Sequence, residues 1–342
     1  MNEEKTYADQ CLERLREHQQ WVTRERDKWL QARNMYEDDA YRDSRSVAEK
    51  AKDGQKFFEV NRIKPWVTSY VASLFYKGMT VNVTAGEAEM VKDVDEDNPP
   101  EKAMALLFDR FLATELAEEL TEQAFRMGLI YPHAGLKVGI DPRISNPLHK
   151  VWLYCAPVSE IFWDRGTPAR TMQRWKGHCY QISKHALKQR FEDKTFIIDE
   201  AEGYARRDSI EEGVSGRPGS GGPDAAREEV FVEVLEFWDH EREYSEGGES
   251  ESGSYTVWLV CEAELKPLFE GAISYENVDG LPLDEVAELV LDPRPEKPLW
   301  GLSAVASLAN LNKEENYHRT TLARAARKDA ARALLFRKGV FD

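Results

Sequence analysis

The chain has 342 residues and a net charge of −16, from 46 basic and 62 acidic side chains. This acidity excludes a protein that wraps nucleic acid nonspecifically, because phosphate binding needs a positive face. Apolar residues form 42% of the chain and aromatic residues 11%, which excludes intrinsic disorder because so much apolar surface can form a packed core. No apolar run approaches the roughly 18 residues of a membrane span, so we expect no membrane partner. The polar start MNEEKTYADQ is unlike a signal peptide.

The cysteines are scattered, with no CxxC pair and no His at metal-ligand spacing; they are Cys11, Cys155, Cys179 and Cys261. A zinc site and a disulfide framework are therefore not expected. We predict buried free thiols in a reducing compartment.

Two helices are predicted near the N-terminus. Residues 1–35 carry apolar or long side chains every three or four positions, although Gln19 and Arg26 interrupt that seam. A helix docked on a neighbour is therefore favoured over a self-sufficient coiled coil. Residues 55–77 form a more apolar helix, in which Pro65 implies either a kink or a helix start near Lys64.

A short alternating strand is predicted over 79–86, followed by a long helix over 101–127. This helix carries an apolar ridge from Met104 to Leu120 that needs a large cover. Gly128 is a plausible stop at its C-terminus.

The residue pattern in the middle of the chain predicts several β-strands. The segments that alternate or are rich in Val, Phe and Trp are 133–141, 150–158, 172–183, 227–241 and 254–262. A short helix over 184–193 interrupts them. The last two strands read as a hairpin around a flexible loop at 245–253, and 211–224 is a Gly/Ser/Pro tract expected to be mobile.

The C-terminal region is expected to be extended and then helical. Three prolines make 293–301 extended, because each disfavours a helical conformation in the residue before it. An alanine-rich helix follows over 303–335.

Motifs for phosphate binding and for metal or serine hydrolysis are absent: the sequence has no P-loop, HExxH, GxSxG or strand-bound GxGxxG. Asp93, Asp95 and Asp97 have the spacing of half a calcium loop, but Asn98 and Met104 occupy the positions that need Gly and Glu. An acidic loop is favoured over a metal site there. We therefore predict no enzyme activity, no metal and no cofactor.

His178 and Cys179 are adjacent in a predicted strand, so their side chains point to opposite faces of the sheet. This geometry disfavours a Cys–His catalytic pair.

Basic charge concentrates in the C-terminal helix, which carries Lys313, Arg319, Arg324, Arg327, Lys328, Arg332, Arg337 and Lys338. Arg324, Lys328 and Arg332 are spaced by four and share one helical face. That face could meet DNA phosphates. It could equally be a solvated surface, or pair with acidic residues of a neighbouring subunit.

Several segments, in order, resemble the portal protein of tailed double-stranded DNA bacteriophages. FEVNRIKPWVTSYVASLF (58–75), MGLIYPHAGLKVGIDP (127–142) and CAPVSEIFWD (155–164) are similar to its N-terminal helix and first strand passages. RWKGHCYQISKHALKQRF (174–191) and VEVLEFWDHEREY (232–244) are similar to its wing strands. PLWGLSAVASLANLNKEENYHRTTLARAARKDAARALLFRKG (298–339) is similar to the segment that leads into its stem helix. Each match is degenerate alone, and their shared order carries the resemblance.

The resemblance implies an α+β, phage-portal-like wing domain of helices and twisted antiparallel strands. The corresponding division of the chain is 1–54, a charged helical region; 55–298, the wing-like domain; 299–335, a stem-like helix; and 336–342, the start of a clip-like segment. The family continues with a clip, a second stem helix and a crown. These have no counterpart here, so we expect this sequence to be a portion of a longer protein.

In function, the resemblance implies a structural homo-oligomeric ring, typically a dodecamer, at one capsid vertex of the virion and in the host cytoplasm during assembly. Viral DNA would pass through this head–tail connector nonspecifically during packaging and genome ejection. The implied partners are the terminase, the major capsid protein and a head–tail adaptor. Two alternatives remain open: a virion or head–tail scaffold protein without a channel, and a metal-dependent nuclease that uses Asp93, Asp95 and Asp97.

Overall fold

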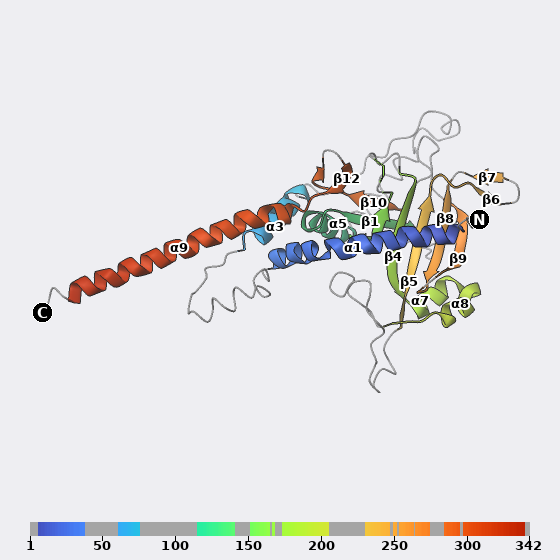
Figure 1. Cartoon of the computed structure of the whole chain (residues 1–342). Helices are drawn as coiled ribbons and strands as arrows, with labels where there is room; N and C mark the ends of the chain where they lie inside the picture. The colour runs from blue at the N-terminus through green and yellow to red at the C-terminus, as the bar shows by residue number, and fades with distance from the viewer. Residues whose placement is uncertain are drawn as a thin grey trace, which may run out of the picture.

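The computed structural model describes residues 6–37, 61–75, 115–140, 151–164, 166–167, 173–204, 230–246, 249–251, 253–262, 264–273, 284–294 and 297–338. In these residues the chain is a mixed α and β protein with antiparallel sheets and a long helix near each end (Figure 1). This composition agrees with the predicted α+β class. Outside the described residues lie the predicted strand 79–86, the aspartates at 93, 95 and 97, and the tract 211–224.

The N-terminal helix α1 (Tyr7–Glu37) agrees with the prediction. Its buried side chains are Cys11, Leu12, Leu15, His18, Val22, Trp29, Ala32 and Met35. The predicted seam needs one correction: Gln19 is only half-buried, and His18 takes the inner position, where its ring stacks on Phe162 with centroids 4.6 Å apart. Helix α1 packs on sheet and helices of its own chain, so the predicted 1–54 region shares a core with the residues after it.

Helix α3 (Ile63–Phe75) begins just before Pro65, so the proline lies in the first turn and no kink is required. Asn61 determines this start. Its side-chain oxygen accepts hydrogen bonds from the first two helical N–H groups, at 2.9 and 3.2 Å. Its amide nitrogen donates to two carbonyls at the end of α1, both at 3.1 Å. One side chain thus satisfies both helix ends and joins them.

Helix α5 (Glu115–Ile130) continues two residues past Gly128, which the sequence marked as its stop. A Cβ atom at Gly128 would lie 3.3 Å from Leu291, so the glycine permits close packing instead of ending the helix. Pro132 follows and cannot extend the helical hydrogen bonding. Of the predicted ridge from Met104 to Leu120, only Leu120 has a described side chain, and it is half-buried.

The larger sheet has the strand order β3-β4-β5-β8-β9 and is antiparallel throughout. Its strands are β3 (Ile161–Trp163), β4 (Trp175–Ser183), β5 (Phe231–Asp239), β8 (Ser254–Val260) and β9 (Leu265–Ala272). A smaller antiparallel sheet has the order β10-β1-β2, from β10 (Val286–Leu289), β1 (Ala134–Ile140) and β2 (Val151–Ala156). The predicted pairing of 227–241 with 254–262 is confirmed as β5 against β8.

Both faces of the larger sheet are covered. Leu235 and Phe237 of β5 point toward α1. Val232 and Val234 point to the opposite face, which is covered by α7 (Lys184–Arg190) and α8 (Thr195–Glu200); the turn η2 (Glu192–Lys194) links these helices. Further along that face, Trp238 packs with residues of the smaller sheet. The strand alternation of β5 therefore sorts its side chains between two cores.

The segment 245–253, predicted as a flexible loop, contains regular structure. Strands β6 (Tyr244–Glu246) and β7 (Glu249–Glu251) pair antiparallel there. The sequence places Gly247 and Gly248 between them, a pair that favours a tight hairpin turn. Composition alone therefore did not predict these two short strands.

The C-terminal helix α9 (Ala304–Lys338) has 35 residues, a length of about 50 Å. It follows the extended pair β11 (Pro293–Arg294) and β12 (Lys297–Gly301) and projects well beyond the body (Figure 1). Two expectations are corrected: the segment 299–335 begins in a strand, and Arg337 and Lys338 are helical and do not start a clip-like strand. Basic side chains such as these stabilise the C-terminal end of a helix. The next residue in the sequence is Gly339, and glycine is common directly after a helix.

Candidate functional site

The base of α9 is held by the end of α5. The Ser303 hydroxyl donates to the carbonyl of Ile130 and accepts the N–H of Ala306 at 3.0 Å, which caps the helix. Gly301 lies against the backbone of Pro132, where an added Cβ would be 1.8 Å from the carbonyl oxygen. The direction in which α9 leaves the body is therefore determined by a hydroxyl contact and by a close approach of two backbones, the second of which side-chain rotation cannot adjust.

Helix α9 has one buried face. Its members are Val305, Ala309, Asn316 and Thr320, which are at most 7% exposed. Val305 and Ala309 join the core formed by α1, α3 and α5. The helix is thus anchored along roughly its first half.

The candidate DNA-facing residues Arg324, Lys328 and Arg332 all lie in α9. Residues four positions apart are offset by about 40° around the helix axis, so these three occupy one sector of the helix, as predicted. Arg324 is exposed, and the side chains of Lys328 and Arg332 lie outside the described set. From Thr320 to Arg324 the helix turns by only about 40°. Arg324 therefore lies at the edge of the buried face, and helical geometry places positions 328 and 332 successively further round the helix axis.

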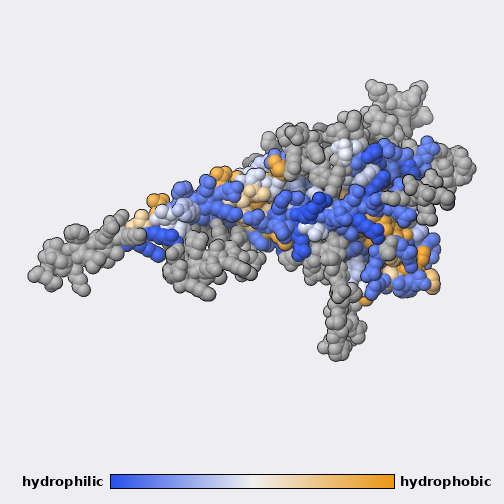
Figure 2. Space-filling view, in the orientation of Figure 1, coloured by the Kyte–Doolittle hydropathy of each residue, from blue (hydrophilic) through white to orange (hydrophobic). Residues whose placement is uncertain are grey.

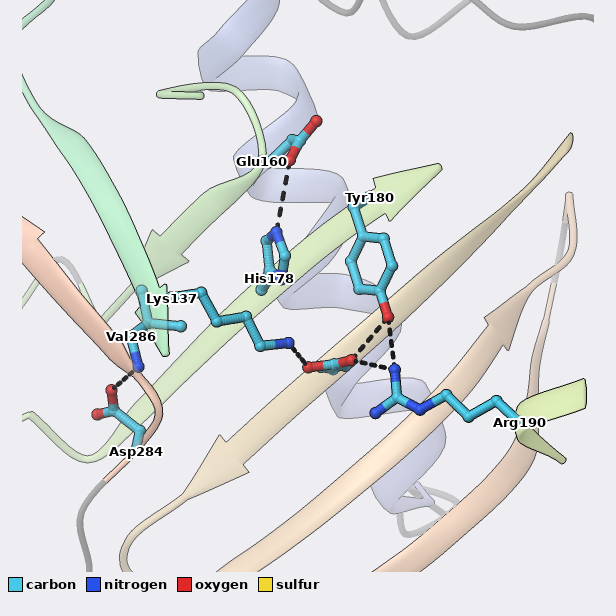
Figure 3. A network of polar contacts seen from close by, with 8 residues as sticks. Lys137, Glu160, His178, Tyr180, Arg190, Asp284 and Val286 are labelled. Carbon is cyan, nitrogen blue, oxygen red and sulfur yellow. Dashed lines mark hydrogen bonds and ion pairs between the residues drawn. The ribbon is translucent and has the colours of Figure 1, made fainter. Parts of the chain in front are cut away.

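A network of buried charge joins the two sheets (Figure 3). Glu236 of β5 is fully buried and forms an ion pair with Lys137 of β1, which is 3% exposed. Its other carboxylate oxygen accepts from Tyr180 at 2.7 Å and from Arg190 at 3.0 Å. The Lys137 ammonium also lies 5.5 Å from the ring centres of Tyr180 and Trp238. Each buried charge therefore has several partners.

A second buried pair runs in the opposite direction between the same sheets. Lys176 of β4, 2% exposed, donates to Asp284 at 2.7 Å and to the carbonyl of Val286 at 2.8 Å, and forms an ion pair with Glu288 of β10. His240 lies 3.5 Å from the other oxygen of Asp284. Each sheet thus sends one lysine to carboxylates that belong to the other sheet or flank it.

The chemistry of these groups is that of fixed charge. Burial alone would raise the pKa of Glu236. The positive charges of Lys137, Arg190 and His178 outweigh burial and lower this pKa from 4.5 to about 2. The same balance lowers the pKa of Asp284, where His240 and Lys176 outweigh burial. Burial raises the pKa of the Cys179 thiol well above its usual range, which keeps the sulfur protonated. The carboxylates are therefore ionised at neutral pH and hold no proton to transfer.

The sheet separates His178 from Cys179, as expected. His178 stacks on Tyr180 and lies 3.4 Å from Glu160, whereas Cys179 packs with the core under α1. All four cysteines are free thiols; Cys11 and Cys155 are buried, as predicted, whereas Cys179 and Cys261 are only half-buried. Among the described residues, no group of three His, Cys, Asp or Glu side chains could hold a metal ion.

Sequence reasoning missed the buried ion pairs, although a signal existed. On the face of β5 that points away from α1, Glu236 lies between Val232, Val234 and Trp238, so the glutamate interrupts an apolar series. A charged residue at an inward strand position is rare unless it is paired. Its partner Lys137 lies 99 positions earlier, and no local pattern connects the two.

The pKa of Glu236 predicts how stability depends on pH. The ordinary pKa is 4.5 and the folded value is about 2, so the stabilisation is complete above pH 4.5 and is lost as pH falls through 2. We expect the difference in unfolding free energy between wild type and Glu236→Gln to shrink by about 3 kcal/mol between pH 5 and pH 2. Urea denaturation at each pH measures it, and a difference independent of pH would contradict this assignment.

Comparison with known proteins finds no protein-family model that matches the chain and no curated protein that matches it. Within the described part of the chain, no helix is both long and apolar enough to cross a membrane. The class of this protein is therefore described by its fold alone, a mixed α and β body with a projecting basic helix.

Proposed function

We propose that this chain is a subunit of a phage portal ring, located at the capsid vertex of the virion and assembled in the host cytoplasm. The observation that carries the proposal is helix α9, which leaves an α and β body and places three basic residues on one sector that begins beside its buried face. Copies arranged around an axis would direct these helices along a common channel. The order of portal-like segments in the sequence supports the same architecture.

The charge of the chain suits a conduit. Arg324, Lys328 and Arg332 would supply few phosphate contacts per subunit, while the net charge of −16 limits tight binding elsewhere. Phosphate contacts carry no sequence information and weaken with salt, so DNA could slide. A separate terminase would supply the energy, and the major capsid protein and a head–tail adaptor would hold the ring in place.

Negative-stain imaging of the purified chain tests the ring. We expect closed particles with a central hole, typically of twelve copies. A compact particle without a hole would overturn the proposal and favour a scaffold protein of the head or tail.

Charge reversal tests the DNA contact. Arg324→Glu with Lys328→Glu should reduce the DNA packaged or retained by assembled particles, because two cations per subunit become repulsive to phosphate. Rings should still form. The matched control is Arg16→Glu with Arg24→Glu, which changes the net charge equally at exposed positions of α1.

Normal packaging by the α9 variant would contradict the DNA role and leave the basic sector as a solvated surface. Failure of its rings, with intact control rings, would instead assign these residues to ion pairs between subunits.

A further inference from the structure

Large apolar side chains are exposed on the two helices that form the neck between the body and the tip of α9. Those with 40% or more of their surface exposed are Trp66, Tyr70, Leu74, Leu311, Tyr317 and Leu322. Figure 2 shows hydrophobic residues at the surface along the stretch where α3 and α9 lie. Exposed apolar side chains that recur along one helix are unusual on a monomer.

Five of these side chains form two stripes, one on α3 and one on α9, that lie on either side of a polar contact between the helices. Trp66, Tyr70 and Leu74 follow Arg62 on α3 at intervals of four, and the Trp66 and Tyr70 rings stack with centroids 5.5 Å apart. Arg62 pairs with Glu315 of α9 at 3.3 Å, and its N–H donates to the Asn312 side chain at 3.3 Å. The salt bridge therefore joins the apolar face of α3 to the part of α9 around Glu315.

On α9 the apolar side chains flank Glu315. Leu311 precedes it by four residues and Leu322 follows it by seven, so all three share a sector. Arg324 is nine residues after Glu315, about two and a half turns, and therefore lies on the opposite side of the helix. We call Trp66, Tyr70, Leu74, Leu311 and Leu322 the neck surface. It is separate from the basic sector.

The neck surface is large enough for a specific contact. Given the size of these side chains, their exposed parts offer on the order of 500 Å² of apolar area. A standard interface buries about 800 Å² on each partner, a little over half of it apolar. The tip of α9 also needs a neighbour, because an isolated helix is marginally stable in water. Leu322 is 69% exposed on this part of the helix.

Charge indicates what covers the surface. Residues 313–338 carry eight basic and three acidic side chains, a net charge of +5 within a chain of −16, which leaves −21 on all other residues. The net charge of the helix therefore attracts it over a long range to the acidic remainder of another copy, whereas the apolar neck surface itself would make the contact. Contact between two identical neck surfaces would bring two basic helices together. The charge thus favours a head-to-tail contact, the kind that can close a ring.

We propose that the neck surface docks on a second copy of this chain, in a head-to-tail contact, and so forms the interface between adjacent subunits of the ring on whose proposal it rests. Burial of Leu311 and Leu322 against the neighbour would then leave Arg324 on the opposite side of α9.

The test measures mass by light scattering over a range of concentrations. One variant carries Leu311→Ser with Leu322→Ser, and a second carries Tyr70→Ser with Leu74→Ser. Each should weaken association by roughly 100-fold, because two apolar side chains lose their burial. The control is Phe196→Ser on α8, which is 72% exposed and outside the neck surface. It should keep the wild-type mass.

The outcomes separate the two proposals. If wild type and both variants form the same rings, the neck surface is not the interface and the ring proposal stands. If wild type is monomeric at every concentration, the ring proposal itself fails. A variant that keeps the wild-type mass but unfolds at a lower temperature would show that the chain's own residues cover the surface, which also overturns the docking proposal.

Discussion

Replacing Glu236 with Gln is expected to lower the free energy of unfolding by about 3–5 kcal/mol, because the substitution leaves a buried ammonium without its anion. Lys137 is 3% exposed and cannot reach water without separating the two sheets. The amide has one acceptor oxygen in place of two, so Tyr180 and Arg190 keep an acceptor only if the amide NH2 group faces the Lys137 ammonium. Urea denaturation at pH 7 measures the change.

The control for this substitution is the double variant Glu236→Gln with Lys137→Met. It removes both charges, so most of the lost stability should return even though the ion pair is gone. If the double variant were as unstable as the single one, the loss would come from packing and not from an uncompensated charge.

Gly301→Ala is expected to lower the free energy of unfolding by about 3 kcal/mol, at the upper end of the usual cost of overpacking. The new methyl group would lie 1.8 Å from the Pro132 carbonyl oxygen. A backbone atom cannot move away by changing rotamer, so the strand before α9 must shift. This shift would break the contact between Ser303 and Ile130 that orients the helix. The variant should therefore also assemble poorly.

Gly166→Ala is the matched control, since among the described residues a Cβ there meets the Asp164 side chain alone, at 3.3 Å. It should unfold within about 0.5 kcal/mol of wild type, as exposed substitutions usually do. Equal losses in the two variants would indicate that the cost is the general one of replacing glycine, and that Gly301 has no special role.

The two buried lysine pairs explain how the sheets are held at one relative position. Apolar packing between sheets is non-directional and tolerates sliding. A buried ammonium that reaches a carboxylate across the interface does not, because sliding would separate the two charges at a site that water does not reach. Lys137 and Lys176 point in opposite directions across the same interface, so together they specify its register.

The sequence alone determined most of the elements, because the period of apolar residues is a local property. It predicted α1, the pairing of β5 with β8, and a long basic helix at the C-terminus, and a start of α3 near Lys64 was one of the two alternatives that Pro65 left open. It also placed Arg324, Lys328 and Arg332 on one face, since helical geometry alone decides which residues share a face. Where it was wrong, at Gly128 and at the end of α9, a local signal competed with packing or with a favourable helix end.

The tertiary structure alone decided what each face meets. That Lys137 pairs with Glu236, that Gly301 touches Pro132, and that Arg62 joins α3 to α9 are contacts between residues far apart in the chain. Such contacts leave no periodic trace, because a side chain looks the same in sequence whether it faces water, a neighbour or a buried partner. The direction in which α9 leaves the body therefore depends on these long-range contacts, and the pattern of residues along the sequence does not predict it.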